Sequence, residues 1–174
     1  PNFRIMSPLG YEKEDLDKIK SMPEVDIIME SYTKDVFINK EESTYTAKLF
    51  SYDEKDKDEG TFLNRPIIEE GRLPEKSGEI ALEGKIRGIP KIKLGDTITL
   101  TLPNGDKLSD SFKESTYKVT GFVTMPYYAS FERGQTNIGH GSIDYYGFIS
   151  KQDFALEDIT DLFIKTKESD DFIA

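Results

Sequence analysis

The sequence predicts an α+β fold: a mixed, mostly antiparallel sheet with few short helices and a small lobe rich in aromatic residues and glycine. Segments in which apolar and polar residues alternate outnumber the segments with helical spacing. The helical segments also do not alternate regularly with strands, as they would in a doubly wound α/β protein. No internal repeat or Pro/Gly/Ser linker divides the 174 residues. We therefore expect a single domain over 1–174, with room for a small lobe at about 104–146.

The first half of the chain is expected to contain one helix and two strands. Leu16 and Ile19 are three residues apart among charged residues, which predicts a short amphipathic helix, and Pro23 ends it. Two alternating stretches follow and predict strands that pair through a turn. The predicted elements are a helix over 12–22, strands over 25–38 and 44–52, and a turn at 40–43.

Short strands and turns are expected in the second half. Ile98, Leu100 and Leu102 alternate with threonines and predict a strand. Asn104-Gly105 follows it and predicts a hairpin, because this pair supplies the positive φ angles of a tight turn. The other predicted elements are strands over 79–82, 117–123, 145–149 and 162–165, a helical turn over 151–154, and a weak helix or turn over 84–88.

The composition excludes several classes of function. The net charge is −10, from 23 basic and 33 acidic residues, which disfavours binding to nucleic acid or to an anionic membrane surface. The chain has no cysteine, which excludes disulfides, thiol catalysis and zinc–thiolate sites. Eleven Phe and nine Tyr argue against disorder, because disordered chains lack large side chains to bury.

The two ends of the sequence suggest a piece of a longer protein. The chain begins at Pro1 instead of Met, and Ser169-Asp170-Asp171 has the pattern of a helix N-cap followed by an acidic first turn. We therefore expect a processed or excised fragment. No apolar run in these residues reaches the roughly 18 residues of a membrane span.

The only histidine, His140, is the one candidate for a catalytic base. A Ser-His-Asp site needs a serine presented on a sharp turn, and the sequence has no Gly-x-Ser-x-Gly motif. Asp144 is close in sequence, but triad partners are brought together by the fold. The glycine-rich stretch 134–141 matches neither a P-loop nor a dinucleotide-binding motif. We expect an exposed loop histidine and no enzymatic activity.

A charge run over 53–60 is the one candidate for a metal site. Asp56-x-Asp58-x-Gly60 has part of the spacing of a calcium loop. Counted from Asp56, the twelfth position is Ile67, which cannot ligate calcium. A solvated loop is the simpler interpretation, and calcium binding at 53–60 is left open.

Aromatic residues concentrate between Met125 and Tyr146, where they predict either a packed lobe or a contact surface for a peptide or protein. For the second interpretation we select the aromatic and charged residues of this stretch. The candidate contact residues are Tyr127, Tyr128, Phe131, Arg133, His140, Tyr145 and Tyr146.

Four motifs in a fixed order then carry a resemblance to a known family. They are Gly71-Arg72-Leu73-Pro74, Gly78-Glu79-Ile80-Ala81-Leu82, Lys93-Leu94-Gly95-Asp96-Thr97-Ile98 and Tyr117-Lys118-Val119-Thr120-Gly121-Phe122-Val123. In this order and spacing they resemble the extracytoplasmic, MacB-like periplasmic core domain of FtsX/MacB-type ABC transporter permeases, in their Gram-positive branch. Over 84–90 the sequence departs from many relatives, which have a fuller helix there.

The resemblance implies an extracellular domain inserted between the first two transmembrane helices of a permease in the cell membrane. A separate subunit of such transporters hydrolyses ATP, so the resemblance implies no cofactor in this domain. Its implied partners are that ATP-binding subunit, reached through the membrane region, and an extracellular protein, lipoprotein or peptide. The motifs themselves are interpreted as scaffold: Gly71 and Gly95 allow tight turns, and Gly121 marks a bulge or a close backbone approach.

Two alternatives are retained beside the permease. One is a free-standing extracellular module that binds a peptide or protein. The other is a hydrolase that uses His140.

Overall fold

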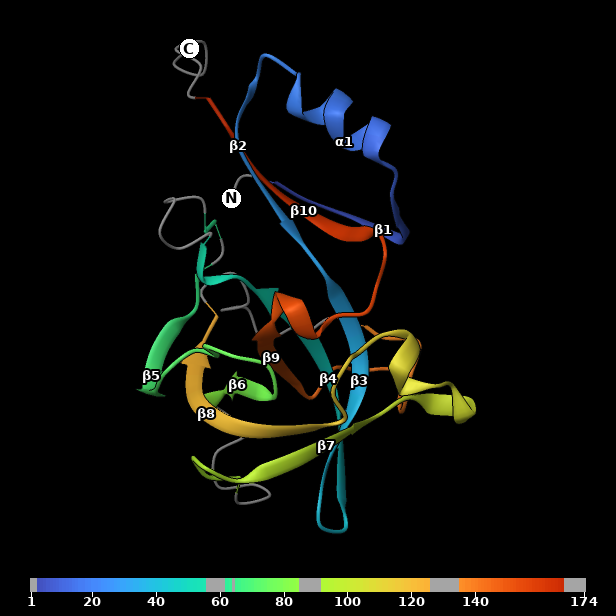
Figure 1. The fold of residues 1–174 in the computed structure, drawn as a ribbon, viewed down its shortest axis with the longest axis vertical. Helices are drawn as coiled ribbons and strands as arrows, with labels where there is room; N and C mark the ends of the chain where they lie inside the picture. Colours follow the sequence, from blue (N-terminus) through green and yellow to red (C-terminus); the bar gives the residue numbers. More distant parts are fainter. Residues whose placement is uncertain (1–2, 56–61, 64, 85–91, 126–134, 168–174) are drawn as a thin grey trace.

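The computed structural model of the chain describes residues 3–55, 62–63, 65–84, 92–125 and 135–167 (Figure 1). Its strands form two sheets, one of three strands and one of seven, with a single α-helix and short 3₁₀ turns in these residues. The predicted α+β class, with a mixed and mostly antiparallel sheet, is confirmed.

The small sheet has the order β1-β10-β2 and is antiparallel throughout. Helix α1 joins β1 to β2 and packs against one face of the sheet through Leu16 and Ile19, as their spacing predicts. Phe3 pairs with Ile164, so the first and last described strands lie side by side (Figure 1). The elements are β1 (Phe3–Tyr11), α1 (Lys13–Lys20), β2 (Val25–Ser31) and β10 (Ile159–Thr166).

The large sheet has the order β5-β8-β6-β9-β4-β3-β7 and closes on itself, because β7 also pairs with β8. The closed ring is a barrel, and β5 lies outside it on β8. Pairs β4–β9 and β6–β8 are parallel and the remaining pairs are antiparallel. The strands are β3 (Thr33–Lys40), β4 (Ser43–Tyr52), β5 (Ile67–Gly71), β6 (Glu79–Glu83), β7 (Thr97–Thr101), β8 (Thr116–Thr124) and β9 (Tyr145–Ser150).

The core has three parts. Val36, Ile38 and Leu49 belong to a cluster that fills the barrel. Phe50 and Phe148, on the outer face of the barrel, pack with Met29 and Phe163 of the small sheet and join the two sheets. A third cluster lies between the other face of the small sheet and α1. Both faces of the small sheet therefore contribute to packing.

The structure corrects three expectations about the elements. The stretch 25–38 forms two strands in different sheets, β2 and β3, separated at Tyr32. Strand β1 was not predicted, because much of it is exposed and its residues do not alternate cleanly. Strands β7 and β8 pair antiparallel, as the predicted hairpin requires, but Asn104 and Gly105, which have the expected positive φ, form a 3₁₀ turn, and the chain returns only at Thr116. Most of the predicted helix or turn at 84–88 lies outside the described residues.

The predicted pairing of the strand at 44–52 is confirmed for β3 and β4, which are joined by the turn Glu41-Glu42. None of the helices that the structure describes is long and apolar enough to cross a bilayer.

Candidate functional site

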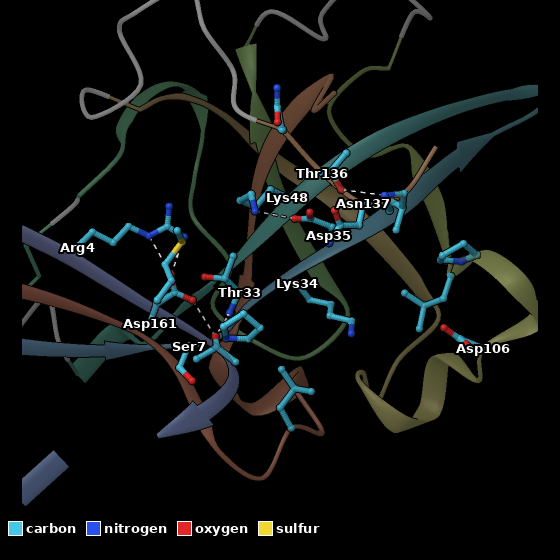
Figure 2. A pocket seen from close by; sticks show the side chains of 18 residues that line it. Arg4, Ser7, Thr33, Lys34, Asp35, Lys48, Asp106, Thr136, Asn137 and Asp161 are labelled. Carbon is cyan, nitrogen blue, oxygen red and sulfur yellow. Dashed lines mark hydrogen bonds and ion pairs between the residues drawn. The ribbon is translucent and has the colours of Figure 1, made fainter. Parts of the chain in front are cut away.

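A groove of about 490 Å³ lies between the small sheet and the outer face of the barrel (Figure 2). Its walls come from β1 and β10 on one side and from β3 and β4 on the other. The segments 102–106 and 135–138 complete the lining. Strands β1 and β10 and the β3–β4 hairpin therefore meet in one concave surface, which is the usual form of a ligand site.

One buried ion pair holds the small-sheet side of the groove. The Nη2 and Nε atoms of Arg4 lie 2.6 and 2.9 Å from Oδ1 of Asp161, and both side chains are less than one-tenth exposed. The Arg4 guanidinium also lies over two aromatic rings, 5.2 Å from the centroid of Phe50 and 5.5 Å from that of Phe163. Because Phe50 belongs to the barrel, Arg4 connects the two sheets.

The barrel side of the groove carries a second ion pair. Asp35 on β3 lies 2.8 Å from the Nζ of Lys48 at the paired position on β4 (Figure 2). Lys34 and Asp106 add one charge of each sign to the lining. The charges that line the groove are therefore balanced in sign.

Hydrogen bonds fix the junction where the chain passes from β2 into β3. The backbone N–H of Tyr32 donates to Oγ of Ser51 at 2.9 Å, and that hydroxyl lies 3.0 Å from Oγ of Ser31. The N–H of Thr33 donates to Oγ1 of Thr160 at 2.8 Å. Because these bonds link β3 to both β4 and β10, they set the position of one groove wall relative to the other.

His140 lies in a chain of polar contacts that the sequence did not predict. Its Nδ1 atom lies 2.7 Å from Oγ of Ser142, and its Nε2 atom lies 3.3 Å from Oδ1 of Asp144. Asp144 is in turn held by the backbone of Thr46, whose N–H donates to Oδ2 at 2.9 Å. Ser, His and Asp are the residue types of a hydrolase triad. In the sequence, only the closeness of the three residues indicates that they could be in contact.

The surroundings of this chain of contacts differ from those of a hydrolase site. Ser142, His140 and Asp144 belong to one turn, and the His140 side chain is 60% exposed. None of the three lines the groove. A nucleophile needs a bound substrate and donors aimed at the oxyanion. The contacts are accounted for by a turn that anchors to β4 through Asp144.

The candidate contact residues have different positions. Tyr127, Tyr128, Phe131 and Arg133 lie outside the described residues. Tyr146 is 1% exposed and packs against Phe50, with the ring centroids 6.1 Å apart. Tyr145 is half-buried and packs edge-on against Tyr45 at 5.5 Å. His140 is exposed, and a contact surface in this part of the chain stays a prediction.

The charge run at 53–60 is described only as far as Lys55. Within the described parts of the chain, no group of three His, Asp or Glu side chains could hold a metal ion.

The structure is similar to a solved extracellular domain of the noncanonic ABC-type transporter YknZ from Gram-positive bacteria. The match has a TM-score of 0.50 and 13% sequence identity, and it covers 94% of this chain and 77% of that chain. The chain has the fold of this extracellular domain. The resemblance that the four motifs predicted is therefore confirmed at the level of the fold. No protein-family model matches the sequence, and no curated protein matches it.

The four motifs that carried the resemblance meet around one strand, β8. The N–H of Arg72 donates to the carbonyl of Thr120, and that of Lys118 donates to the carbonyl of Gly78. Val119 exchanges bonds with the turn at Gly95-Asp96. The motifs therefore describe the packing of three neighbouring segments on β8, as the scaffold interpretation predicted.

Arg72 and Glu79, from the first two motifs, form an ion pair beside this strand: Arg72 follows β5 and Glu79 begins β6. Nη1 and Nη2 of Arg72 each donate to a carboxylate oxygen of Glu79 at 2.7 Å. The N–H of Glu75 adds a third bond at 3.0 Å. The hydrogen bonds from Arg72 lower the pKa of the buried Glu79 carboxyl to about 2. The Glu79 carboxyl therefore stays ionised near neutral pH. Its position indicates a role in stabilising the fold instead of a role in acid–base chemistry.

Proposed function

We propose that this chain is the extracytoplasmic domain of an ABC transporter permease. In this proposal the domain is not catalytic; it contacts substrate or partner proteins and is coupled to membrane helices that a separate ATPase drives. The observation that carries the proposal is the fold, which is shared with the extracellular domain of an ABC-type transporter over 94% of this chain.

The route of the chain supports the proposal. Phe3 on β1 is paired with Ile164 on β10, so the chain enters and leaves the small sheet at the same end. An insertion between two membrane helices needs such adjacent ends. The barrel is attached through two connections, from β2 to β3 and from β9 to β10 (Figure 1). A movement of the membrane helices would displace the small sheet first. The barrel would then move relative to the small sheet, which would change the groove between them.

The proposed partners follow from this placement. The ATP-binding subunit would be reached only through the membrane region, and the domain itself would use no cofactor. An extracellular protein, lipoprotein or peptide would meet the barrel or the groove. The alternative is a free-standing extracellular module with the same fold, which would bind its partner without a membrane region.

A single introduced cysteine tests the placement, because the chain has none of its own. Glu42→Cys lies in the exposed β3–β4 turn, and the control, Ala47→Cys, lies at a fully buried position. In intact cells that produce the natural full-length protein, a membrane-impermeant maleimide should label the Glu42→Cys variant and not the Ala47→Cys variant. The labelled protein should sediment with the membranes together with an ATP-binding subunit.

Two results would contradict the proposal in different ways. Labelling only after cell lysis would place the domain on the cytoplasmic side. Labelling of a protein that is released from the membranes by salt would instead favour the free-standing module.

Absence of catalysis is tested at Ser142. A fluorophosphonate probe forms an adduct with serines that a neighbouring base activates. We expect no adduct on Ser142 by mass spectrometry of the intact chain, because the groove formed by the described residues does not include this turn. An adduct that is lost in His140→Ala would show an active hydrolase and would refute this part of the proposal.

A further inference from the structure

We propose that the groove between the two sheets binds a linear peptide in extended conformation, whose main chain pairs with a free edge of β3. This goes beyond the proposed function, because it concerns the 174-residue chain itself and holds with or without a surrounding permease.

The edge of β3 is only partly used by the described residues. On one side, β3 pairs with β4 along its whole length, from Thr33 to Lys40. On the other side, β7 pairs only with the segment Phe37–Asn39. The pairing stops because β7 ends at Thr101 and Pro103 begins a 3₁₀ turn. Proline has no N–H to donate to a ladder, so the turn ends the edge abruptly.

The register shows which backbone groups are left at this edge. The two-residue turn Glu41-Glu42 makes Lys40 and Ser43 a hydrogen-bonded pair, so the even-numbered residues of β3 bond to β4 and the odd-numbered ones point away from it. Thr33 follows this rule, since its N–H donates to Thr160 instead of β4. Phe37 also follows it, since it pairs with Thr101.

Asp35 is the odd-numbered residue between these two. Extending the β3–β7 register by two residues would place Pro103 opposite it, but β7 has already ended there. The N–H and C=O of Asp35 therefore point past the end of β7, toward the groove that Asp35, Leu102 and Pro103 all line. A free strand edge that borders a groove is the site at which peptides add as an extra strand.

The dimensions and lining of the groove suit an extended peptide. The gap between Thr33 and Phe37 has room for about three residues of a partner strand, at roughly 3.4 Å each. The volume of about 490 Å³ lies within the range of ligand sites. Met6 is 60% exposed and offers an apolar contact, while Lys34 and Asp106 offer one charge of each sign. Alternate side chains of an extended peptide would contact the apolar and the charged parts of the lining.

The net charge of the chain favours one class of peptide over another. The lining is balanced in charge, but the chain as a whole carries −10. Its field favours the approach of cationic molecules. We therefore expect peptides with lysine or arginine to bind more tightly than acidic peptides of the same length.

The test uses fluorescein-labelled heptapeptides in which valine alternates with lysine. A second version carries N-methyl groups on alternate residues, which removes the donors needed for strand pairing. Fluorescence anisotropy with the 174-residue chain should show saturable binding of the first peptide. The methyl groups can be placed on either of two alternate sets of residues, and only one set turns its N–H groups toward β3. N-methylation of that set should weaken binding by about tenfold or more. Absence of binding up to about 1 mM peptide would overturn the proposal.

Two variants locate the site. Asn137→Trp fills the groove from an exposed position and should weaken binding about tenfold or more, whereas Glu42→Trp, in the distant β3–β4 turn, should leave it unchanged. Hydrogen exchange adds a direct measure of pairing. Bound peptide should slow exchange of the Asp35 amide and leave that of Lys34, already bonded to β4, nearly unchanged. Binding that Asn137→Trp leaves intact, or an Asp35 amide that exchanges equally fast, would refute the strand-pairing site.

Discussion

Gly121→Ala is expected to destabilise the fold by about 3 kcal/mol or more. A Cβ atom at position 121 would lie 2.2 Å from the carbonyl oxygen of Arg72 and 2.9 Å from its carbonyl carbon. These are backbone atoms, so no side-chain rotation can relieve the clash. The N–H of Arg72 also bonds to Thr120 on β8, so separating the two segments would break this bond. Urea unfolding of the 174-residue chain measures the loss.

Gly105→Ala is the matched control. Gly105 has φ +74° and nothing within 4 Å of an added Cβ, so its substitution carries only the cost of the left-handed backbone, about 1 kcal/mol. Gly71→Ala should resemble Gly121→Ala, because its Cβ would lie 2.2 Å from the carbonyl oxygen of Thr120. If Gly121→Ala is no more destabilising than Gly105→Ala, the close approach of these backbones is not a determinant of stability.

Arg72→Met should remove a strongly pH-dependent ion pair beside β8. The pKa of Glu79 is lowered from 4.5 to about 2 in the folded chain, mainly by hydrogen bonds from Arg72. A carboxyl with a lowered folded pKa contributes stability above its unfolded pKa and loses it as the pH falls through the folded value. The natural chain should therefore lose stability as the pH falls from about 4.5 to about 2. The expected loss in the free energy of unfolding is roughly 2 kcal/mol; it is not larger because water partly screens the half-exposed Arg72.

The variant should behave differently across this range. At neutral pH it leaves the Glu79 carboxylate buried without its guanidinium, a loss of about 3 kcal/mol in the free energy of unfolding. That loss should shrink as acid protonates Glu79. Lys18→Met, which removes an exposed ion pair with Asp15, is the control and should cost well under about 1 kcal/mol at any pH. Parallel pH curves for Arg72→Met and the natural chain would show that Glu79 is not held by Arg72.

Local patterns predicted the elements whose signals are complete within a short window. The spacing of Leu16 and Ile19 with Pro23 after them identified α1, and alternation identified β4 and β7. The ordered glycines identified the fold, because Gly71, Gly95 and Gly121 occupy backbone positions that tolerate no side chain or need a positive φ. Arg72 and Glu79 both belong to these motifs, but the spacing of the two residues does not show that they form an ion pair.

Other features depended on distant residues. The stretch 25–38 marks the break at Tyr32 only weakly: its apolar residues lie at odd positions before it (Val25, Ile27, Met29) and at even positions after it (Val36, Ile38). The break arises because Ser51 and Thr160, far along the chain, bond to the backbone of Tyr32 and Thr33. The antiparallel pairing of β7 with β8 confirms the predicted hairpin, but barrel closure also needs the pairing of β3 with β7, which are distant in sequence.

The sequence by itself determined that this is an acidic, cysteine-free α+β domain with a recognisable glycine scaffold, because composition and steric demands on glycine are local properties. Only the tertiary structure decided where a ligand could bind. The groove lies where Arg4, paired with Asp161 of the small sheet, lies over Phe50 of the barrel. Among the described residues, the edge of β3 is uncovered at Asp35 because β7 ends two residues too early. Both depend on which strands become neighbours, and many individually weak long-range contacts decide that together.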